Sequence, residues 1–263
     1  MEHFISLWLF TFASQAAVGM VLVKAVLLIA GRIGGDDIRT EKLQKAITLL
    51  LLFSLATAFF HLGKPFRAVY ALNNIGTSPL SMEIASLSLL LVTAAAGVWL
   101  CLRGTVNLLT RLLPAVEVAA GLLLLLTMTA VYMLPSVPAW YTAMTPLAFV
   151  LTVVSAGPAA FAMVARNDIP GGSRWLLAAG AVAAMLLAAS GVAGVAGRGT
   201  LVLMLFILQA ALALAAFVLI SRRFNAPDLN KNSRMTVITA ILVLMSGFIA
   251  RLLFFLSYDN TIL

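Results

Sequence analysis

The sequence contains very few residues that could bind a metal centre. Cysteine occurs once, as Cys101, which excludes an internal disulfide, an iron–sulfur cluster and a structural zinc site. Histidine occurs twice, as His3 and His61, and only His61 lies well inside the chain. Because a haem in a membrane bundle usually takes paired axial ligands from facing helices, a b-type haem is not expected either. We therefore expect no metal site in this chain.

Charge is also scarce. Charged residues make up 10% of the 263 residues, whereas hydrophobic residues make up 63%. Soluble domains carry about 25% charged residues, so the composition indicates a membrane protein, organised as one polytopic domain over residues 1–263. The net charge of +8 could suggest nucleic-acid binding. The basic residues fall between apolar runs rather than in one stripe, however, which is typical of topology signals.

Eight apolar stretches are long enough to cross a bilayer, which takes about 20 helical residues. A single helix over 175–221 would be more than twice that length, so we place a break near Gly197-Arg198-Gly199. The expected spans are 4–31, 43–62, 80–102, 112–134, 141–165, 175–197, 199–221 and 235–257. The prediction is an all-α, polytopic membrane helical bundle with eight transmembrane helices.

The distribution of lysine and arginine predicts the orientation of these spans. The odd-numbered loops hold twelve such residues and the even-numbered loops hold three. Cytoplasmic loops are the ones enriched in Lys and Arg. We therefore expect both termini outside, and we expect the connector between the second and third spans on the outer face.

A histidine and a glutamate lie at the two ends of that connector. His61 occupies the last turn of the second span, and Glu83 lies about one turn inside the third. Thr57 and Ser54 share a helix face with His61, and Ser86 shares one with Glu83. Because an external hairpin joins the two spans, we expect them to be antiparallel neighbours. Their polar faces are then predicted to meet in a pocket just under the outer surface.

A base and a carboxylic acid beside an apolar pocket suit a lipid-soluble quinol. Oxidation of a quinol needs two acceptors for its hydroxyl protons, close enough to water for the protons to leave. An imidazole titrates near physiological pH, and a partly desolvated carboxylate gains affinity for protons. The alternative is that His61 and Glu83 only cap helices at the interface. The spacing alone favours that alternative somewhat more.

Gln15, Arg251, Lys24 and Glu117 are weaker candidates inside the predicted spans, where ionisable groups are costly and call for a function or a partner. Gln15 lies deep in the first span, where a hydrogen bond within the bundle is favoured over one to a ligand. Arg251 lies about two turns from the outer end of the last span and is expected to snorkel or to neutralise Glu83. Lys24 and Glu117 both fall in the inner half, so we expect an internal pair.

Several stretches resemble one family of membrane proteins. The strongest is HLGKPFRAVYALNNIGTSPLSMEI, over residues 61–84. It resembles the hallmark segment of the DmsC-type membrane anchor subunit of dimethyl sulfoxide reductase. Members of that family carry HLG-x-P-x-R-A near N-x-x-x-S-x-L-S-x-E-I. FTFASQAAVG and VPAWYTAMTPLAFVLTVVSAGP also look similar, FIARLLFF is a looser match, and the sixth and seventh spans match only in hydropathy.

This resemblance implies a haem-free, eight-helix anchor that oxidises menaquinol on the outer side of the bacterial cytoplasmic (inner) membrane. His61 and Glu83 match residues associated with the family's quinol site, and Arg67 matches its connector arginine. The implied partners are a four-cluster iron–sulfur subunit and a molybdopterin catalytic subunit that reduces an S- or N-oxide. The protein would then be a subunit of a quinol-dependent oxidoreductase, with no terminal reductase activity alone.

Two sets of residues are the resulting candidates. The candidate quinol-binding residues are His61, Glu83, Arg67, Ser86, Thr57 and Gln15, of which His61 and Glu83 are the catalytic pair. The candidate docking residues for the partner subunits are Lys64, Arg67, Tyr70, Asn73 and Asn74.

Three other functions remain open from the sequence. An anchor of a polysulfide or tetrathionate reductase would use the same quinol chemistry, but it would be expected to carry more charge inside the membrane. A secondary transporter would more often show related halves and helices broken by Gly or Pro at the midplane, and neither is evident. A purely structural tether would leave the His61–Glu83 pair without a purpose.

Overall fold

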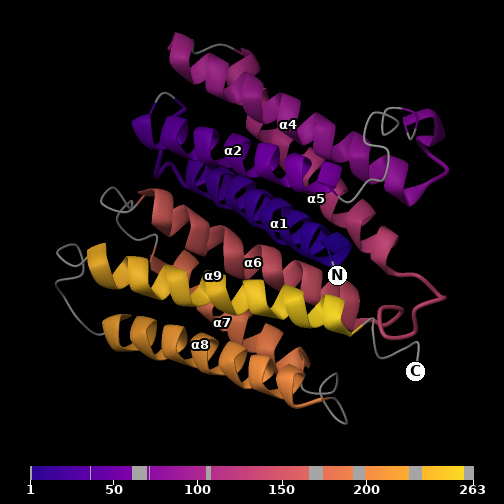
Figure 1. The fold of residues 1–263 in the computed structure, drawn as a ribbon. Helices are drawn as coiled ribbons and strands as arrows, with labels where there is room; N and C mark the ends of the chain where they lie inside the picture. The colour runs from indigo at the N-terminus through magenta and orange to yellow at the C-terminus, as the bar shows by residue number, and fades with distance from the viewer. Residues whose placement is uncertain are drawn as a thin grey trace.

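The computed structural model describes most of the protein as helix. The described residues are 2–35, 37–60, 70, 72–104, 108–165, 174–191, 199–224 and 233–257. Within them lie eight α-helices and one short 3₁₀ helix, η2 (Figure 1). Their bounds are α1 Glu2–Ile29, α2 Ile38–Phe60, η2 Leu72–Asn74, α4 Pro79–Arg103, α5 Leu108–Tyr132, α6 Met144–Ala165, α7 Arg174–Gly191, α8 Thr200–Phe224 and α9 Ser233–Leu256.

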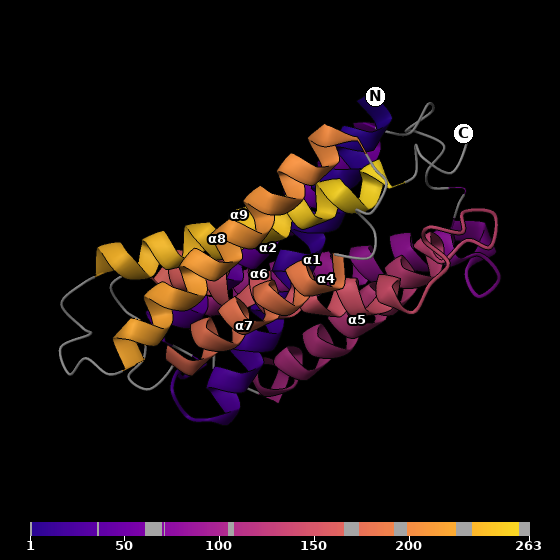
Figure 2. The ribbon, with the colours of Figure 1, turned by 90° about the horizontal axis from the view of Figure 1, so that it is seen from below.

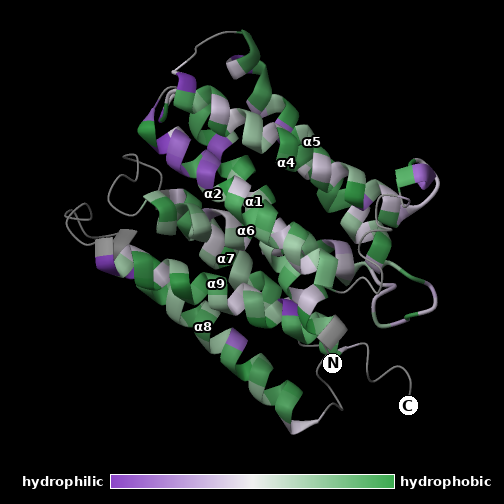
Figure 3. Ribbon diagram, turned by 45° about the horizontal axis from the view of Figure 1, so that its top comes forward, coloured by the Kyte–Doolittle hydropathy of each residue, from purple (hydrophilic) through white to green (hydrophobic). Residues whose placement is uncertain are grey.

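The eight α-helices confirm the predicted all-α membrane bundle. Seven of them are long and apolar enough to cross a membrane, and the apolar part of α7, Trp175–Gly191, is shorter. Each helix overlaps one of the eight predicted spans. The predicted break near Gly197 falls outside the described residues, but α7 and α8 on its two sides are separate helices that pack together. In Figure 3 the flanks of the helices are largely hydrophobic, and hydrophilic residues gather at the start of α2.

Local sequence explains the bounds of α4, the helix that carries Glu83. Pro79 stands at its first position, where a missing N–H costs nothing and a fixed φ favours the helix. At the other end, Gly104 takes the left-handed conformation with φ of 60°, and its N–H donates to the Cys101 carbonyl. A C-terminal glycine of this kind closes a helix. Glu83 is thereby fixed in the second turn of α4.

Helix α1 lies at the centre of the bundle. It packs against α2, α5, α6 and α9, and it separates the group α2, α4 and α5 from the group α7, α8 and α9 (Figures 1 and 2). Its closest approach is to α6, where Gly19 faces Gly157. A Cβ added at Gly19 would lie 2.6 Å from the Gly157 Cα, so the two backbones touch there. Small residues permit such close packing between membrane helices.

Several helix ends that matter for function lie together. Helices α1 and α4 begin, and α5 and α9 end, at the same end of the bundle (Figure 1). We call this the site end. Glu83, Tyr132 and Arg251 all lie within about two turns of it, so the fold can place them in one region.

Candidate functional site

Glu83 lies inside the bundle and not at its surface. Its residue is 4% exposed, and its Oε1 atom has no hydrogen-bond partner. A carboxyl oxygen buried without a partner is unfavourable, and in a membrane protein such a group points to a functional site. Glu83 thus faces the protein interior, and its predicted role in a quinol pocket stays a prediction.

Ser86 links α4 to α5 one turn deeper than Glu83. The Ser86 hydroxyl lies 3.0 Å from the Glu83 carbonyl oxygen, to which it donates, and 3.1 Å from the Thr127 hydroxyl of α5. A cavity of about 340 Å³ lies beside the contact between Ser86 and Thr127, and Thr127 is one of its lining residues. Glu83 does not belong to that wall. The other lining residues are Gly76, Thr77, Ser78, Pro79, Met82, Leu126 and Ala130.

Gln15 reaches the same stretch of α5 from the central helix. Its residue is 1% exposed, and its Nε2 atom donates to the Met128 sulfur at 3.5 Å. The expected hydrogen bond within the bundle is therefore present. The Oε1 atom of Gln15 nevertheless has no partner. Since Met128 lies one turn before Tyr132, Gln15 presents a free acceptor close to the end of α5.

Arg251 neither snorkels nor pairs with Glu83, so both expectations for this residue were wrong. The residue is 1% exposed. Its Nε and Nη2 atoms donate to the Thr152 hydroxyl of α6, each at 3.2 Å. The guanidinium carbon lies 4.0 Å from the centre of the Phe149 ring. These contacts hold the side chain inside the bundle, whereas snorkelling requires an open path to the headgroups.

A cluster of aromatic side chains closes the site end between α5, α6 and α9. Tyr132 contacts the rings of Phe149 and Phe254, with centroids 5.7 and 5.9 Å apart. Trp140 stacks on Phe254 at 5.1 Å, and its Nε1 donates to the Phe254 carbonyl at 3.1 Å. Tyr132 lies within electrostatic range of both Glu83 and Arg251. This cluster therefore connects the two ionisable groups.

Thr57 has a local role. Its hydroxyl donates to the Ser54 carbonyl at 2.8 Å, and the Ser54 hydroxyl donates to the Phe10 carbonyl of α1 at 3.2 Å. The predicted polar face of α2 is thus buried against α1, with its hydroxyls already bonded to backbone. His61 lies outside the described residues, so its predicted meeting with Glu83 stays a prediction.

The candidate docking residues can be placed only in part. Tyr70, Asn73 and Asn74 are exposed beside the start of α4, as a docking surface requires. Lys64 and Arg67 lie outside the described residues. The role of all five as a docking surface stays a prediction.

Two unpartnered polar atoms lie near the site end. Four buried side-chain atoms in the described part of the protein have no hydrogen-bond partner. Three of them belong to Gln15, Glu83 and Arg251, and the fourth belongs to Gln209 of α8. Glu83 and Arg251, near the site end, contribute one acceptor oxygen and one donor nitrogen, and Gln15 contributes an acceptor oxygen deeper in α1. Groups of these two kinds suit a small molecule that carries hydroxyl and carbonyl groups.

Sequence reasoning missed the residues that position Arg251. Thr152 and Phe149 lie a turn apart on α6 and contact a residue about 100 positions later in the sequence. Neither stands out in an apolar run. The sequence did hold one indication of these contacts, which was Arg251 itself. A lone cation inside a membrane span requires hydrogen-bond partners on neighbouring helices.

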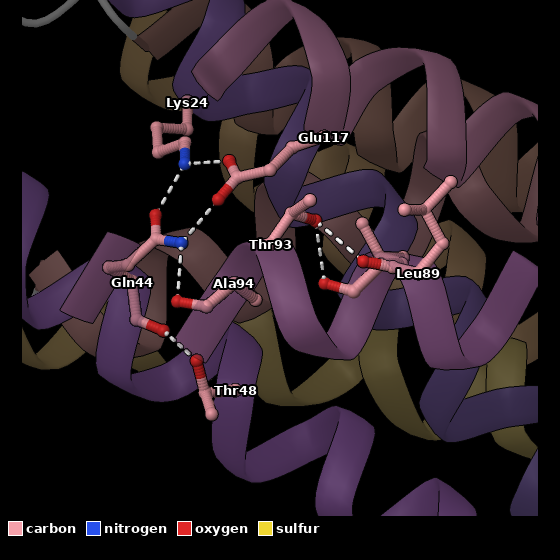
Figure 4. Close-up of polar contacts among 8 residues, drawn as sticks. Lys24, Gln44, Thr48, Leu89, Thr93, Ala94 and Glu117 are labelled. Atoms are coloured by element: carbon pink, nitrogen blue, oxygen red, sulfur yellow. Dashed lines mark hydrogen bonds and ion pairs between the residues drawn. The ribbon is translucent and has the colours of Figure 1, made fainter. Parts of the chain in front are cut away.

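The opposite half of the bundle holds the predicted ion pair of Lys24 and Glu117, which is confirmed (Figure 4). Gln44 of α2 adds to it, because its amide accepts from Lys24 and donates to Glu117. The Gln44 amide also donates to the Ala94 carbonyl of α4 at 3.0 Å. The group therefore links four helices. Its charges are balanced within the protein, which distinguishes it from the site end.

Comparison with known proteins assigns the family. The family model described as DMSO reductase anchor subunit (DmsC) matches residues 1–199. The protein belongs to this family. The match to the DmsC family covers α1 to α7, including Glu83 and the segment that first indicated the resemblance. Helices α8 and α9, and with them Arg251, lie beyond the matched residues.

Curated relatives are subunits of anaerobic dimethyl sulfoxide reductases. The sequence is 34% identical over 161 residues to the YnfH subunit of an anaerobic dimethyl sulfoxide reductase of Escherichia coli, a match that covers 60% of this sequence and 56% of that protein. It is 31% identical over 204 residues to the C subunit of anaerobic dimethyl sulfoxide reductase from the same organism, covering 72% of this sequence and 67% of that protein. A third relative, the C subunit from Haemophilus influenzae, is 33% identical over 150 residues, covering 56% of this sequence and 53% of that protein. The matched part thus spans little more than half the length of two of these relatives. Together with the apolar helices, the family places this protein among multi-pass membrane anchor subunits.

Proposed function

We propose that this protein binds menaquinol at the site end, oxidises it there and passes the electrons to an iron–sulfur partner subunit. That partner would serve a molybdopterin enzyme that reduces dimethyl sulfoxide or another S- or N-oxide. The observation that carries the proposal is Glu83, a buried carboxyl with an unpartnered oxygen in the second turn of α4. The family match supports it, because the family is that of the DMSO reductase anchor subunit.

The chemistry follows from what a quinol must lose. Its oxidation releases two protons and two electrons. We assign one proton to His61, whose imidazole can act as a general base, and the other to Glu83, which accepts or relays it toward the outside. The sequence has one cysteine and two histidines, so the electrons need an acceptor outside this protein. An iron–sulfur cluster of a partner subunit is an acceptor of the right class.

The remaining candidates take supporting roles. Gln15 offers a free acceptor near the end of α5, and Ser86 steadies the turn that carries Glu83. Thr57 is bonded to its own helix, so we assign it to the wall of the site. We propose that Lys64, Arg67, Tyr70, Asn73 and Asn74 form the docking surface for the iron–sulfur subunit. On this account the complex lies in the bacterial inner membrane, with the site end facing outward.

The test compares two electron donors in membranes that contain the whole complex. A water-soluble naphthoquinol reports the complete path, whereas a reduced viologen dye feeds the partner subunits directly. Glu83→Lys is expected to abolish quinol-dependent turnover, because a buried cation is costly and repels a protonated base. His61→Ala should slow it by about 10²-fold, the scale of a lost general base. Glu41→Gln, which changes a partly exposed carboxylate of α2 paired with Lys45, is the control and should leave both activities unchanged.

Each outcome has a clear meaning. Loss of quinol-dependent turnover with normal dye-dependent turnover supports the proposed site. Normal quinol-dependent turnover in both variants contradicts it. If both activities fall together, His61 and Glu83 hold the complex together and the capping interpretation is correct. We also expect the purified protein to show no haem absorption, and a stoichiometric b-type spectrum would contradict the proposal.

A further inference from the structure

Arg251 is a buried cation without a matching anion in the described part of the protein. Its residue is 1% exposed, and its Nη1 atom has no hydrogen-bond partner. No carboxylate of the described residues forms an ion pair with it, in contrast to Lys24, which has Glu117. A charge removed from water without compensation costs several kcal/mol. A membrane protein that retains such a group generally uses it.

The surrounding contacts orient the guanidinium but leave one edge available. Thr152 accepts two of its N–H groups through a single neutral hydroxyl. The rings of Phe149 and Phe254, at 4.0 and 5.2 Å, fix the plane of the group. A guanidinium has five N–H donors, and the two on Nη1 remain unused. The result is a preorganised donor that faces no acceptor among the residues that the structure describes.

The missing partner can be inferred from the ligand of the proposed function. Glu83, near the same end of the bundle, offers an acceptor oxygen, which suits a hydroxyl group of a quinol. The quinone that forms from it has no hydroxyl, so its carbonyl oxygens need donors instead. Arg251 offers a donor of this kind, and Tyr132 lies within electrostatic range of both it and Glu83. The other unpartnered donor among the described residues, Gln209 Nε2, belongs to α8, which is not part of the aromatic cluster.

We propose that Arg251 binds a ring oxygen of the quinone ligand through Nη1 and stabilises the negative charge on that oxygen when the quinol loses its proton. This inference rests on the proposed function, because it assigns a further residue to the same site. It extends the site from α4 to α6 and α9. It also assigns a role to α9, which lies beyond the residues matched by the family.

The experiment measures ligand binding rather than turnover. Two probes are titrated into membranes containing the full complex. One is an alkyl 2-hydroxy-1,4-naphthoquinone, an anion at neutral pH, and the other is the uncharged 2-methyl-1,4-naphthoquinone. Arg251→Gln should weaken binding of the anion by about 10-fold to 100-fold, the scale of a lost charged hydrogen bond, and weaken the neutral probe much less. Arg103→Gln is the control, because Arg103 also stacks on an aromatic ring, 4.8 Å from the centre of Trp99.

A second variant keeps the test decisive if Arg251→Gln does not accumulate. Arg251→Lys retains a cation. The lysine ammonium, however, cannot replace the planar guanidinium, whose several N–H groups can bind Thr152 and a ligand at the same time. We expect it to weaken the anionic probe by about tenfold with an unchanged thermal unfolding temperature. Unchanged affinity in Arg251→Lys overturns the inference, and so does an equal loss for both probes with a lowered unfolding temperature. If the unmodified complex binds neither probe, the proposed function itself fails. If Glu83→Gln weakens binding and the Arg251 variants do not, only the role of Arg251 fails.

Discussion

Lys24 of α1 and Glu117 of α5 form an ion pair whose side chains are 3% and 0% exposed. Gln44 bonds to both and to the backbone of α4. The pair is thus desolvated and hydrogen-bonded to a third side chain, and further hydrogen bonds of this kind are what make a buried pair tolerable. Its position explains how four helices are held in register.

Removing one member of this pair should strongly destabilise the protein. Glu117→Ala leaves Lys24 buried without an anion, and we expect a loss of about 3 to 5 kcal/mol in the free energy of unfolding. The double variant Lys24→Met with Glu117→Leu should lose less, because no charge remains uncompensated. Denaturant unfolding in detergent measures both. Glu41→Ala is the control: it breaks the more exposed pair with Lys45 and should cost about 1 kcal/mol or less. Equal losses for Glu41→Ala and Glu117→Ala would contradict this account.

The contact between α1 and α6 should not tolerate a methyl group. In Gly157→Ala, the new Cβ would lie 2.5 Å from the Gly19 Cα, so the helices must move apart. Overpacking of this kind typically costs about 1 to 3 kcal/mol. Gly35→Ala, where no atom lies within 4 Å of the added Cβ, should change stability far less. Thermal unfolding of the two variants side by side gives the comparison, and a similar shift in both would refute the close approach.

Asp37 caps α2 and should do so in a pH-dependent way. Its carboxylate accepts from the Arg39 backbone N–H at 2.8 Å and from the Arg39 guanidinium. Chiefly through the guanidinium, these contacts lower the pKa of Asp37 below its ordinary value of 3.8, against an opposing effect of burial. Because the folded-state pKa is lower than the unfolded one, the stabilisation is complete above the unfolded value. It is lost as the pH falls through the lowered value.

Asp37→Ala should therefore cost about 1 kcal/mol at neutral pH, the usual worth of an N-cap. The difference from the unmodified protein should shrink in strong acid, where the carboxyl is protonated. Asp37→Asn, which caps without a charge, serves as the control and should depend less on pH. Unfolding measured at several pH values decides the matter, and a difference that grows in acid would show that the sign is wrong.

The loop charges predict which side of the membrane each connector occupies. Twelve Lys and Arg residues fall in the odd-numbered loops and three in the even-numbered ones. Reporter fusions after Ser257 and within 135–139 should therefore report an outside location. Fusions near Asp36 and Asn230 should report an inside location. Inside signals from both of the first two positions would overturn the orientation.

The fold could be predicted largely from the sequence, because membrane helices leave a direct signature. A run of about 20 apolar residues has few alternatives in lipid, where backbone polar groups must be satisfied within the segment. Each of the eight helices was found for this reason, and seven of them are long and apolar enough to cross a membrane. The pairing of Lys24 with Glu117 was predictable too, since two opposite charges at a similar depth in lipid have few other partners.

The candidate site was only partly predictable. Glu83 was found because a carboxylate inside a span is rare. The contacts of Arg251 were not found, because Thr152 and Phe149 look like ordinary residues of an apolar helix. Their importance arises from the packing of α6 against α9, which no local pattern encodes. The Gly19–Gly157 contact was not predicted either, because it also depends on how two helices pack. Small residues are frequent in the spans of this protein, so these two glycines do not stand out.

The ion pair between Lys24 and Glu117 also constrains the order of events during synthesis. The two residues are 93 positions apart, so Lys24 is made long before its counter-ion. At 5 to 20 residues per second, this interval lasts roughly 5 to 20 s. During that time α1 lacks the carboxylate that balances Lys24 in the folded protein, and a charge inside a bilayer is costly. We therefore expect α1 to reach its final depth in the bilayer only when the fourth span, α5, has been made.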